Sequence, residues 1–332
     1  MKQYLLKPAL FVLFAACATF GAFTLDAGVK NKGYIVKHPE YKWTKLTGNA
    51  LFQKGYNFQL LTQGDKLWAF HPDGNYYSAD GKQWTKSSLP NSINNLAFLD
   101  YVKYKNSVLG LGHFEGNIEQ FNLSTTITQT TDFKTWQTLT PKSNLPERFF
   151  YHPVVFNNKI WIFGGTSDGI NNFDDAWSST DGITWSKEAE HLPFGGRSGQ
   201  QFIVFNKQLF MLDNDVWVSN DAIHWDKLAD KITDATLHGY APVVFDNKIW
   251  LLGCNRNGQF ASKVYTSDNG RSWQEQDAPW TPRGGIAAVV FNGNLYMTGG
   301  KYGGFNNGQI EFVYSNDVWM LEKEGTDEQT NR

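Results

Sequence analysis

The chain has 332 residues, a formal net charge of −2 at pH 7, and 16% aromatic residues, including 13 tryptophans. This length is sufficient to bury a sizeable core, as one large repeat domain or as two ordinary domains. The near-neutral charge gives no electrostatic basis for binding nucleic acid or an acidic membrane surface. Cys17 and Cys254 are the only cysteines, so the sequence contains no disulfide framework.

The N-terminus has the pattern of an export signal. Two lysines precede an uncharged run, rich in Ala, Phe and Leu, that extends from Pro8 to Leu25. Residues 16–18, Ala-Cys-Ala, provide a small-x-small cleavage site. We therefore expect residues 1–26 to be a signal peptide and the protein to be exported to the periplasm, the cell envelope or the medium. The alternatives are an uncleaved anchor, because about 18 apolar residues are barely sufficient to span a bilayer, and a lipid on Cys17.

Tryptophan recurs through the rest of the chain at spacings of 41, 52, 49, 40 and 48 residues. The positions are Trp43, Trp84, Trp136, Trp185, Trp225 and Trp273. Gly, Asn and Asp punctuate the short apolar runs between them, and helical periodicity is absent outside the N-terminal run. A period of about 40 to 50 residues with strand-like content is typical of a β-propeller, in which each repeat is one four-stranded blade. Six tryptophans therefore predict six blades.

A turn-like segment precedes five of these tryptophans. Residues 177–185, Trp-Ser-Ser-Thr-Asp-Gly-Ile-Thr-Trp, predict a strand, a two-residue turn at Asp181-Gly182, and a strand that ends on Trp185. The side chains of Ser179 and Asp181 can bond backbone groups of the turn. The same pattern recurs in residues 78–84, 130–136 and 219–225, and in a copy one residue longer at 266–273.

Each of the later repeats also contains two apolar strands joined by a tight turn, as expected of strands buried on both faces. These segments are residues 154–163, 202–211, 243–252 and 289–297. A double glycine follows the second strand at residues 164–165 and 299–300. A third strand begins with Asp-x-Trp at residues 175–177, 215–217 and 317–319.

These features together resemble the kelch-type propeller family, the galactose oxidase/kelch-like repeats, and the turns resemble Asp-boxes. The resemblance implies an all-β, six-bladed propeller of four-stranded blades over residues 27–321. The last repeat stops after its third strand, so we expect residues 34–47, around Trp43, to supply the fourth strand and close the ring. Residues 322–332 are charged and are expected to form a disordered tail.

The strand order makes the two ends of such a ring unequal. Turns of two or three residues gather at one end, and longer second-to-third loops gather at the other, which we call the loop face. The long loops are His113–Ser124, Thr166–Asp174, Asn255–Ser262 and Lys301–Tyr314. Long loops on a rigid scaffold usually carry binding sites, so we expect a site on the loop face, around the central channel.

Three arginines occupy the same position in different repeats. Arg148, Arg197 and Arg283 each lie eight residues before the Phe that ends the first strand of the repeat. Guanidinium groups that converge on a channel would suit a carboxylate or phosphate, which Arg binds through two parallel hydrogen bonds. The alternative is a scaffold role, because kelch-type repeats often carry Arg here to bond neighbouring loop carbonyls. The sequence leaves both interpretations open.

Four further residues are expected to line a ligand site on the loop face: Arg256, His238, Glu115 and Tyr302. His238 stands at the arginine position of the fifth repeat, and Arg256 lies in the long loop of that repeat. The seven histidines show no metal-ligand spacing, so we expect no metal ion and no cofactor.

The favoured function is a binding module that holds a glycan, an anionic small molecule or a protein on the loop face. No nucleic acid is expected, and contact with a membrane is expected only through an N-terminal anchor or lipid. The alternative is an enzyme that acts on acidic sugars. Exported kelch-type sialic acid mutarotases resemble this architecture, whereas a sialidase is disfavoured because the Arg-Ile-Pro motif is missing. Copper chemistry like that of galactose oxidase is disfavoured because Cys254 has no accompanying Tyr/His constellation.

Overall fold

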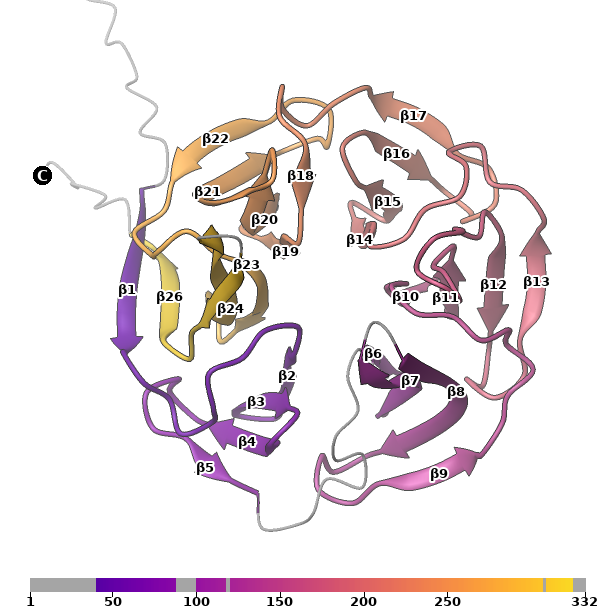
Figure 1. Cartoon of the computed structure of the whole chain (residues 1–332), viewed down its shortest axis with the longest axis horizontal. Helices are drawn as coiled ribbons and strands as arrows, with labels where there is room; N and C mark the ends of the chain where they lie inside the picture. The colour runs from indigo at the N-terminus through magenta and orange to yellow at the C-terminus, as the bar shows by residue number, and fades with distance from the viewer. Residues whose placement is uncertain (1–39, 88–99, 118–119, 307–308, 325–332) are drawn as a thin grey trace, which may run out of the picture. The chain divides into compact units, whose positions relative to one another are not determined.

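The computed structural model describes residues 40–87, 100–117, 120–306 and 309–324, all within one compact unit, Pro39–Arg332. These residues form β-strands and no helix, and the strands make six antiparallel sheets around a ring (Figure 1). The prediction of an all-β, six-bladed propeller is confirmed. No helix suited to crossing a bilayer occurs in the described ranges. The expected signal peptide, residues 1–26, lies outside them.

The first three blades follow the chain without interruption. Blade 1 comprises β2 (Gln59–Gln63), β3 (Lys66–His71), β4 (Gly74–Ser78) and β5 (Thr85–Lys86). Blade 2 comprises β6 (Asp100–Tyr104), β7 (Ser107–Asn117), β8 (Gln120–Thr130) and β9 (Gln137–Thr140). Blade 3 comprises β10 (Val154–Phe156), β11 (Lys159–Phe163), β12 (Ala176–Ser179) and β13 (Ser186–Ala189).

The last three blades have the same four-stranded arrangement, and blades 5 and 6 each contain one extra strand. Blade 4 comprises β14 (Gln201–Phe205), β15 (Gln208–Leu212), β16 (Val216–Ser219) and β17 (Asp226–Ala229). Blade 5 comprises β18 (Leu237–His238), β19 (Ala241–Phe245), β20 (Lys248–Arg256), β21 (Gln259–Ser267) and β22 (Gln274–Asp277). Blade 6 comprises β23 (Gly284–Phe291), β24 (Asn294–Asn306), β25 (Gln309–Tyr314), β26 (Val318–Lys323) and β1 (Tyr41–Thr47).

The hydrophobic core lies between neighbouring blades. Phe163 of blade 3 stacks on Phe202 of blade 4 with 4.5 Å between ring centroids, and Trp225 meets Phe163 edge-on at 5.5 Å. Trp161, on the second strand of blade 3, is 2% exposed and joins the same cluster. Because each blade buries both faces, the inner strands of blades 3 to 6 are mostly apolar, as the sequence predicted.

The tight turns between the first and second strands are confirmed. Asn157 and Asn158 have φ values of 48° and 59°, and Asp246 and Asn247 have 47° and 54°. Two consecutive residues with positive φ make a type I′ turn, whose twist matches that of the flanking strands. Asn and Asp adopt this conformation more readily than other non-glycine residues, which explains their place in these repeats.

The turns before the tryptophans differ from the prediction. β12 ends at Ser179 and β13 begins at Ser186, so residues 180–185 form a longer connection than the two-residue turn expected. Asp181 Oδ1 accepts hydrogen bonds from the backbone N–H groups of Ile183 and Thr184, at 2.7 and 2.8 Å. In a two-residue hairpin these N–H groups would bond to the opposite strand. Here the carboxylate accepts their hydrogen bonds instead, and this stabilises the wider turn.

The copy of this turn in blade 5 has the same length as the others, so the expected extra residue was wrong. Ser267 Oγ accepts from Gly270 N at 2.8 Å, and Asn269 Oδ1 accepts from the backbone N–H groups of Arg271 and Ser272 at 2.8 and 2.9 Å. Asn269 thus occupies the aspartate position, because its amide oxygen offers the same acceptor as a carboxylate oxygen.

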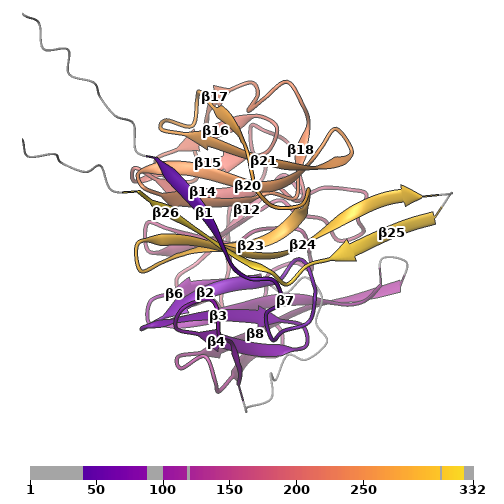
Figure 2. The same ribbon diagram turned by 90° about the vertical axis from the view of Figure 1, so that its left-hand side faces the viewer.

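Three of the four expected long loops are extended hairpins. The pairs β7–β8, β20–β21 and β24–β25 continue the blade strands toward the loop face, and β24–β25 projects well beyond the ring (Figure 2). The register shifts at Gly112 in blade 2 and at Gly253 in blade 5, whose φ values are 61° and 63°. A bulge at a glycine bends the strand and lets pairing resume beyond it. Residues 166–174 remain a loop, as expected.

The ring is closed by the N-terminal strand, which confirms the prediction. β1 pairs antiparallel with β26, from Tyr41 opposite Lys323 to Thr47 opposite Val318, and is the outermost strand of blade 6. Glu322 and Lys323, expected to begin the charged tail, belong to β26, and residues 325–332 lie outside the described ranges.

The segment around β1 also joins blade 6 to both neighbouring blades. Tyr41 donates a hydrogen bond to Asp246 of blade 5 at 2.7 Å, and Trp43 packs edge-on against Trp280 at 4.5 Å. Further along, the side-chain amide of Asn316 donates to the carbonyls of residues 50 and 52, at 3.0 and 2.9 Å, in the segment that leads into blade 1. Loss of β1 would therefore open the ring at one point and loosen both adjacent interfaces.

Deletion of residues 34–47 is expected to destabilise the whole ring, by at least about 3 kcal/mol, because two large aromatic side chains and a ladder of hydrogen bonds are lost. Chemical denaturation followed by tryptophan fluorescence measures the change. Deletion of residues 325–332 is the control and is expected to leave the midpoint unchanged. An unchanged midpoint for the first deletion would show that the ring is held without β1.

Candidate functional site

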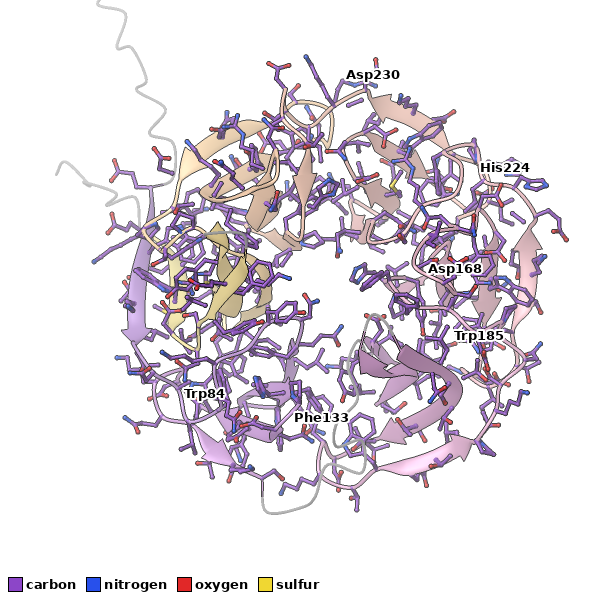
Figure 3. The ribbon with its side chains drawn as sticks, in the orientation of Figure 1. Trp84, Phe133, Asp168, Trp185, His224 and Asp230 are labelled. Atoms are coloured by element: carbon purple, nitrogen blue, oxygen red, sulfur yellow. The ribbon has the colours of Figure 1, made fainter. Side chains whose placement is uncertain are left out.

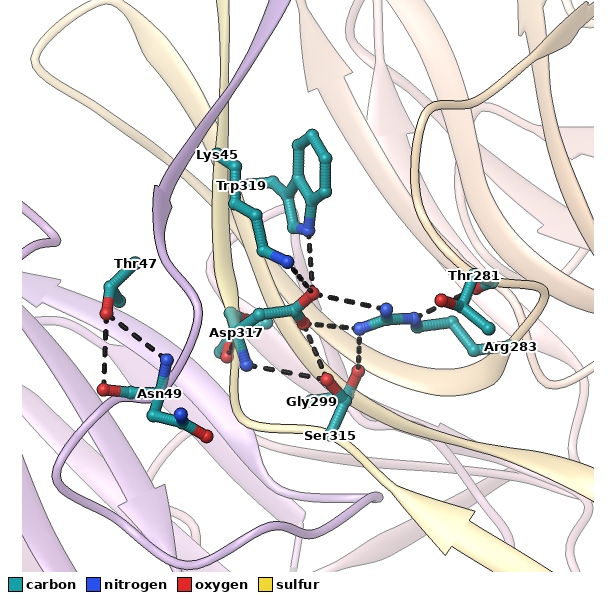
Figure 4. A network of polar contacts seen from close by, with 10 residues as sticks. Lys45, Thr47, Asn49, Thr281, Arg283, Gly299, Ser315, Asp317 and Trp319 are labelled. Atoms are coloured by element: carbon teal, nitrogen blue, oxygen red, sulfur yellow. Dashed lines mark hydrogen bonds and ion pairs between the residues drawn. The ribbon is translucent and has the colours of Figure 1, made fainter.

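Blades 3, 4 and 6 each contain the same cluster of an arginine, an aspartate and a tryptophan. In blade 6, both terminal nitrogens of Arg283 donate to the carboxylate of Asp317, and Trp319 Nε1 donates to the same carboxylate at 2.9 Å (Figure 4). Burial raises the pKa of Asp317, but the hydrogen bonds and charge of Arg283 outweigh that effect, so the net pKa lies below its ordinary value. The pairs Arg148–Asp175 and Arg197–Asp215 have the same geometry.

A lysine from the outermost strand completes each cluster by lying over the tryptophan ring. Lys187 and Lys227 lie 5.6 and 5.8 Å from the ring centroids of Trp177 and Trp217 in blades 3 and 4. In blade 6 the lysine is Lys45 of β1, at 5.4 Å from Trp319. The N-terminal strand therefore supplies the side chain that the fourth strand supplies in the other two blades, as well as the backbone pairing.

The clusters support the scaffold interpretation of two of the three arginines. Arg148 and Arg283 are 4% and 2% exposed, and each also donates to a backbone carbonyl within its own blade, that of Gly164 or Gly299. Their charges are neutralised inside the blade. Arg197 is half-buried and lines the central cavity.

A second repeated position ties each blade to the one before it. Three side chains, each five residues before the end of the innermost strand, donate to a carbonyl of the preceding blade. They are Tyr151 to Leu111 at 2.8 Å, Gln200 to Phe163 at 2.9 Å, and Tyr240 to Asp213 at 2.9 Å. Burial raises the pKa of both tyrosines, so each hydroxyl stays a hydrogen-bond donor. Tyr151 and Tyr240 thus have a structural role.

A third repeated position faces the central cavity from every blade. It lies four residues before the end of the innermost strand and comprises Gln59, Asp100, His152, Gln201, Ala241 and Ala287, which we call the channel ring. The cavity has a volume of about 650 Å³ and lies where the chain enters the innermost strands, at the loop face. Such a volume lies within the range of ligand pockets.

The channel ring is asymmetric. Blades 1 to 4 contribute polar side chains, two amides, one carboxyl and one imidazole, whereas blades 5 and 6 contribute only methyl groups. Pro242 and Ile286 extend the apolar side of the cavity next to Ala241 and Ala287. The cavity therefore presents hydrogen-bonding groups on one side and an apolar wall on the other.

Two neighbouring members of the channel ring form an acid–base pair. His152 Nδ1 lies 3.8 Å from Asp100 Oδ1, and the two side chains are 37% and 14% exposed. Burial raises the pKa of Asp100 well above its ordinary value and lowers the pKa of His152 to about 4. Both shifts favour the uncharged forms, because the walls of the cavity replace water around each group. The pair thus combines a carboxyl group inclined to hold its proton with an imidazole that is neutral at pH 7.

The cavity has no spare positive charge from Arg197. Its guanidinium bonds Asp213 at 2.9 Å and also both carboxylate oxygens of Asp215. Lys227 Nζ lies 3.8 Å from Asp215, so two cations face two carboxylates, and the cluster leaves no unpaired positive charge for an incoming carboxylate or phosphate.

The other expected site residues are spread over the loop face. His238 is exposed and lines the cavity together with Arg197. Arg256 lies 3.4 Å from Glu275 in an ion pair within blade 5, and neither Arg256 nor Tyr302 lines the cavity. Glu115 pairs with Asn122 through the backbone, and its side chain lies outside the described part of the structure.

Sequence reasoning missed the channel ring, although the sequence contains a signal for it. Counting four residues back from the last residue of each innermost strand finds Asp100 and His152 in equivalent places in adjacent blades. Nothing in the residue types marks them, since the six positions hold four different residue types. Among the described side chains, no group of three or more His, Cys, Asp or Glu residues is placed to hold a metal ion.

Comparisons with known proteins support the fold. The sequence matches the model of the DUF6242 beta propeller domain over residues 21–153 and again over residues 135–291. No curated protein matches. Many solved structures are similar, and one of them, the structure of YjhT, aligns with a TM-score of 0.66 and 11% identity over 83% of this chain and 96% of that chain. At this identity, the likeness shows the fold alone. The two overlapping family matches are consistent with internal repeats.

Arg148→Met is expected to destabilise the protein by about 3–5 kcal/mol, because it leaves the buried Asp175 carboxylate without its partner. Guanidinium chloride unfolding measures the difference. Arg271→Met, at an exposed arginine in the turn of blade 5, is the matched control and should change the stability by less than about 0.5 kcal/mol. Equal stability of the two variants would contradict a structural role for the cluster.

Asp100→Asn is expected to raise the melting temperature at pH 7. The pKa of Asp100 is raised in the folded protein, so its carboxyl ionises at a lower pH in the unfolded chain than in the folded protein. The folded state therefore becomes less stable relative to the unfolded state as the pH rises above about 4. Asparagine does not ionise and so removes this penalty. The increase in melting temperature over the wild type should therefore be larger at pH 7 than at pH 4. Melting curves at the two pH values, with Asp226→Asn on the exposed face of β17 as control, measure it. A gain that does not grow with pH would contradict the assigned shift.

Proposed function

The chain belongs to the DUF6242 beta propeller domain family, and we propose that it binds a neutral carbohydrate in the cavity at its loop face. The observation that carries this proposal is the channel ring, in which one position of all six blades faces the same space. A binding site of this kind exists only when the ring of blades is complete, because no single blade supplies more than one of its side chains.

The asymmetry of the channel ring supports a carbohydrate. A sugar ring has hydroxyl groups on its edge and apolar C–H groups on its faces. Gln59, Gln201 and His152 offer donors and acceptors to hydroxyl groups on one side, and Ala241 and Ala287 offer an apolar surface on the other. Ligand sites commonly combine an apolar wall with a few polar groups that fix orientation.

The charge of the lining supports a neutral ligand in this cavity. Arg197 is already paired with Asp213 and Asp215, and burial favours the uncharged forms of Asp100 and His152. Hydrogen bonds to uncharged hydroxyl groups need no compensating charge, whereas a buried anion would need a free cation.

We further assign the repeats to the kelch type and the wide turns to Asp-box-like turns, and we propose that the protein is exported. The double glycine at 164–165, the Arg–Asp clusters and the bonds of Asp181 to the backbone of its turn support the first assignment. The basic and apolar pattern of residues 1–26 supports export.

A second function is favoured by the Asp100–His152 pair, namely exchange of sugar anomers, the class to which sialic acid mutarotases belong. Neutral His152 can accept the proton of an anomeric hydroxyl while the Asp100 carboxyl, whose pKa is raised by burial, donates its proton to the ring oxygen, which opens the ring. Ring closure on the other face then reverses both transfers. Measurement of anomer exchange by NMR, on any sugar that binds, separates this function from binding alone.

A glycan array followed by calorimetric titration tests the proposed binding. We expect a neutral saccharide to bind the purified propeller, and Gln201→Ala and His152→Ala each to weaken binding about fivefold or more, because each removes a hydrogen-bonding group. His224→Ala is the matched control, since His224 lies at the outer edge of the ring, away from the channel (Figure 3). Equal affinity in all variants, or no saccharide binding, would reject the proposal and favour a protein partner.

A further inference from the structure

A lysine without an acidic partner lies between two aromatic rings beside the cavity. Lys301 Nζ, at the base of the β24–β25 hairpin, is 4.3 Å from the ring centroid of Tyr56 and 4.5 Å from that of Phe312. Lys301 forms no ion pair in the part of the chain that the structure describes. Burial lowers the pKa of its ammonium group. The charge is therefore held by aromatic faces while it remains partly shielded from water.

This arrangement differs from that of the lysines that lie over tryptophan rings. Lys45, Lys159, Lys187 and Lys227 each lie over a tryptophan, and each also has a carboxylate within 4.0 Å. Those ammonium groups are neutralised by the fold itself. Lys301 is held by two rings and by no carboxylate among the described side chains, so its charge is available to an anion from outside.

Lys301 lines a groove that is continuous with the cavity. The groove has a volume of about 570 Å³ and is lined by residues of the β20–β21 and β24–β25 hairpins, whose Phe260 and Phe312 rings meet edge-on with 6.2 Å between their centroids. It shares Asn57, His238, Gly239 and Gly285 with the cavity. A ligand longer than one sugar residue could therefore extend from the channel ring into the groove.

We propose that this groove binds a carboxylate-bearing sugar residue, with the Lys301 ammonium as the group that contacts the carboxylate. The ligand is then an acidic oligosaccharide, whose neutral residue lies in the cavity and whose acidic residue lies between the two hairpins. This inference rests on the proposed function. Charge complementarity selects the acidic group, and the wall that the Phe260 and Phe312 rings form together suits an apolar face of a sugar.

The test compares matched disaccharides that differ only in a terminal glucuronic acid or glucose residue. Calorimetric titration gives the ratio of affinities for the acidic and neutral members in the wild type and in Lys301→Met, Lys301→Arg and Lys134→Met. Lys301→Met keeps the apolar stem without the charge, Lys301→Arg keeps the charge, and Lys134→Met removes an exposed lysine from a turn at the opposite end of the ring. A melting curve for each variant verifies that it is folded.

We expect the wild type to prefer the acidic disaccharide about tenfold, as one charge-assisted hydrogen bond provides. Lys301→Met should abolish this preference and retain neutral binding, whereas the other two variants should keep the preference. Equal affinities in the wild type, or a preference unchanged by Lys301→Met, would overturn the inference and leave the proposed function standing. Loss of all saccharide binding in the wild type would overturn both. Acidic binding that needs Lys301 but is insensitive to Gln201→Ala would overturn only the cavity proposal.

Discussion

The structure depends on the pairing of β1 with β26. A propeller buries its blade edges only when the ring closes, and here closure joins residues near both ends of the described chain. The pairing adds more than backbone hydrogen bonds, because Lys45 takes the place that a fourth-strand lysine takes in blades 3 and 4. Tyr41 and Trp43 on the same strand contact blade 5 and the segment that follows it, through Asp246 and Trp280. Residues of all six blades line the cavity, so the cavity depends on the ring that this pairing closes.

Three repeated positions at the start of the blades divide the work between structure and binding. The arginine position fastens the innermost strand to the third strand of its own blade, as Arg148 does with Asp175. The position of Tyr151 fastens each blade to the one before it. One residue further along, the channel ring differs in residue type between blades, and its members line the cavity. Variation at this one position can change the ligand without a change of fold.

The Asp100–His152 pair shows a conflict between stability and function. A carboxyl group in a cavity wall with no hydrogen-bonding cation beside it weakens the folded state at neutral pH, as its raised pKa expresses. Lys301 shows the same kind of conflict with the opposite charge, since burial lowers the pKa of its ammonium group and no acid within the described ranges pairs with it. Both groups border the same continuous space, which is where a ligand would relieve the penalty.

The sequence by itself determined the fold class, the number of blades and the closing strand, because each depends on local periodicity: the spacing of Trp84 to Trp273, the Asn-Asn turn at 157–158, and a last repeat one strand short. It did not determine the width of the Asp181 turn, since a side-chain acceptor replaced backbone pairs there. Nor did it choose between the two interpretations of the arginines, because the partner of Arg283 lies 34 residues away. Only the tertiary structure decided which side chains face the channel. Residues from all six blades meet there, and their mutual distances depend on how the six sheets pack around the ring, which no local pattern encodes.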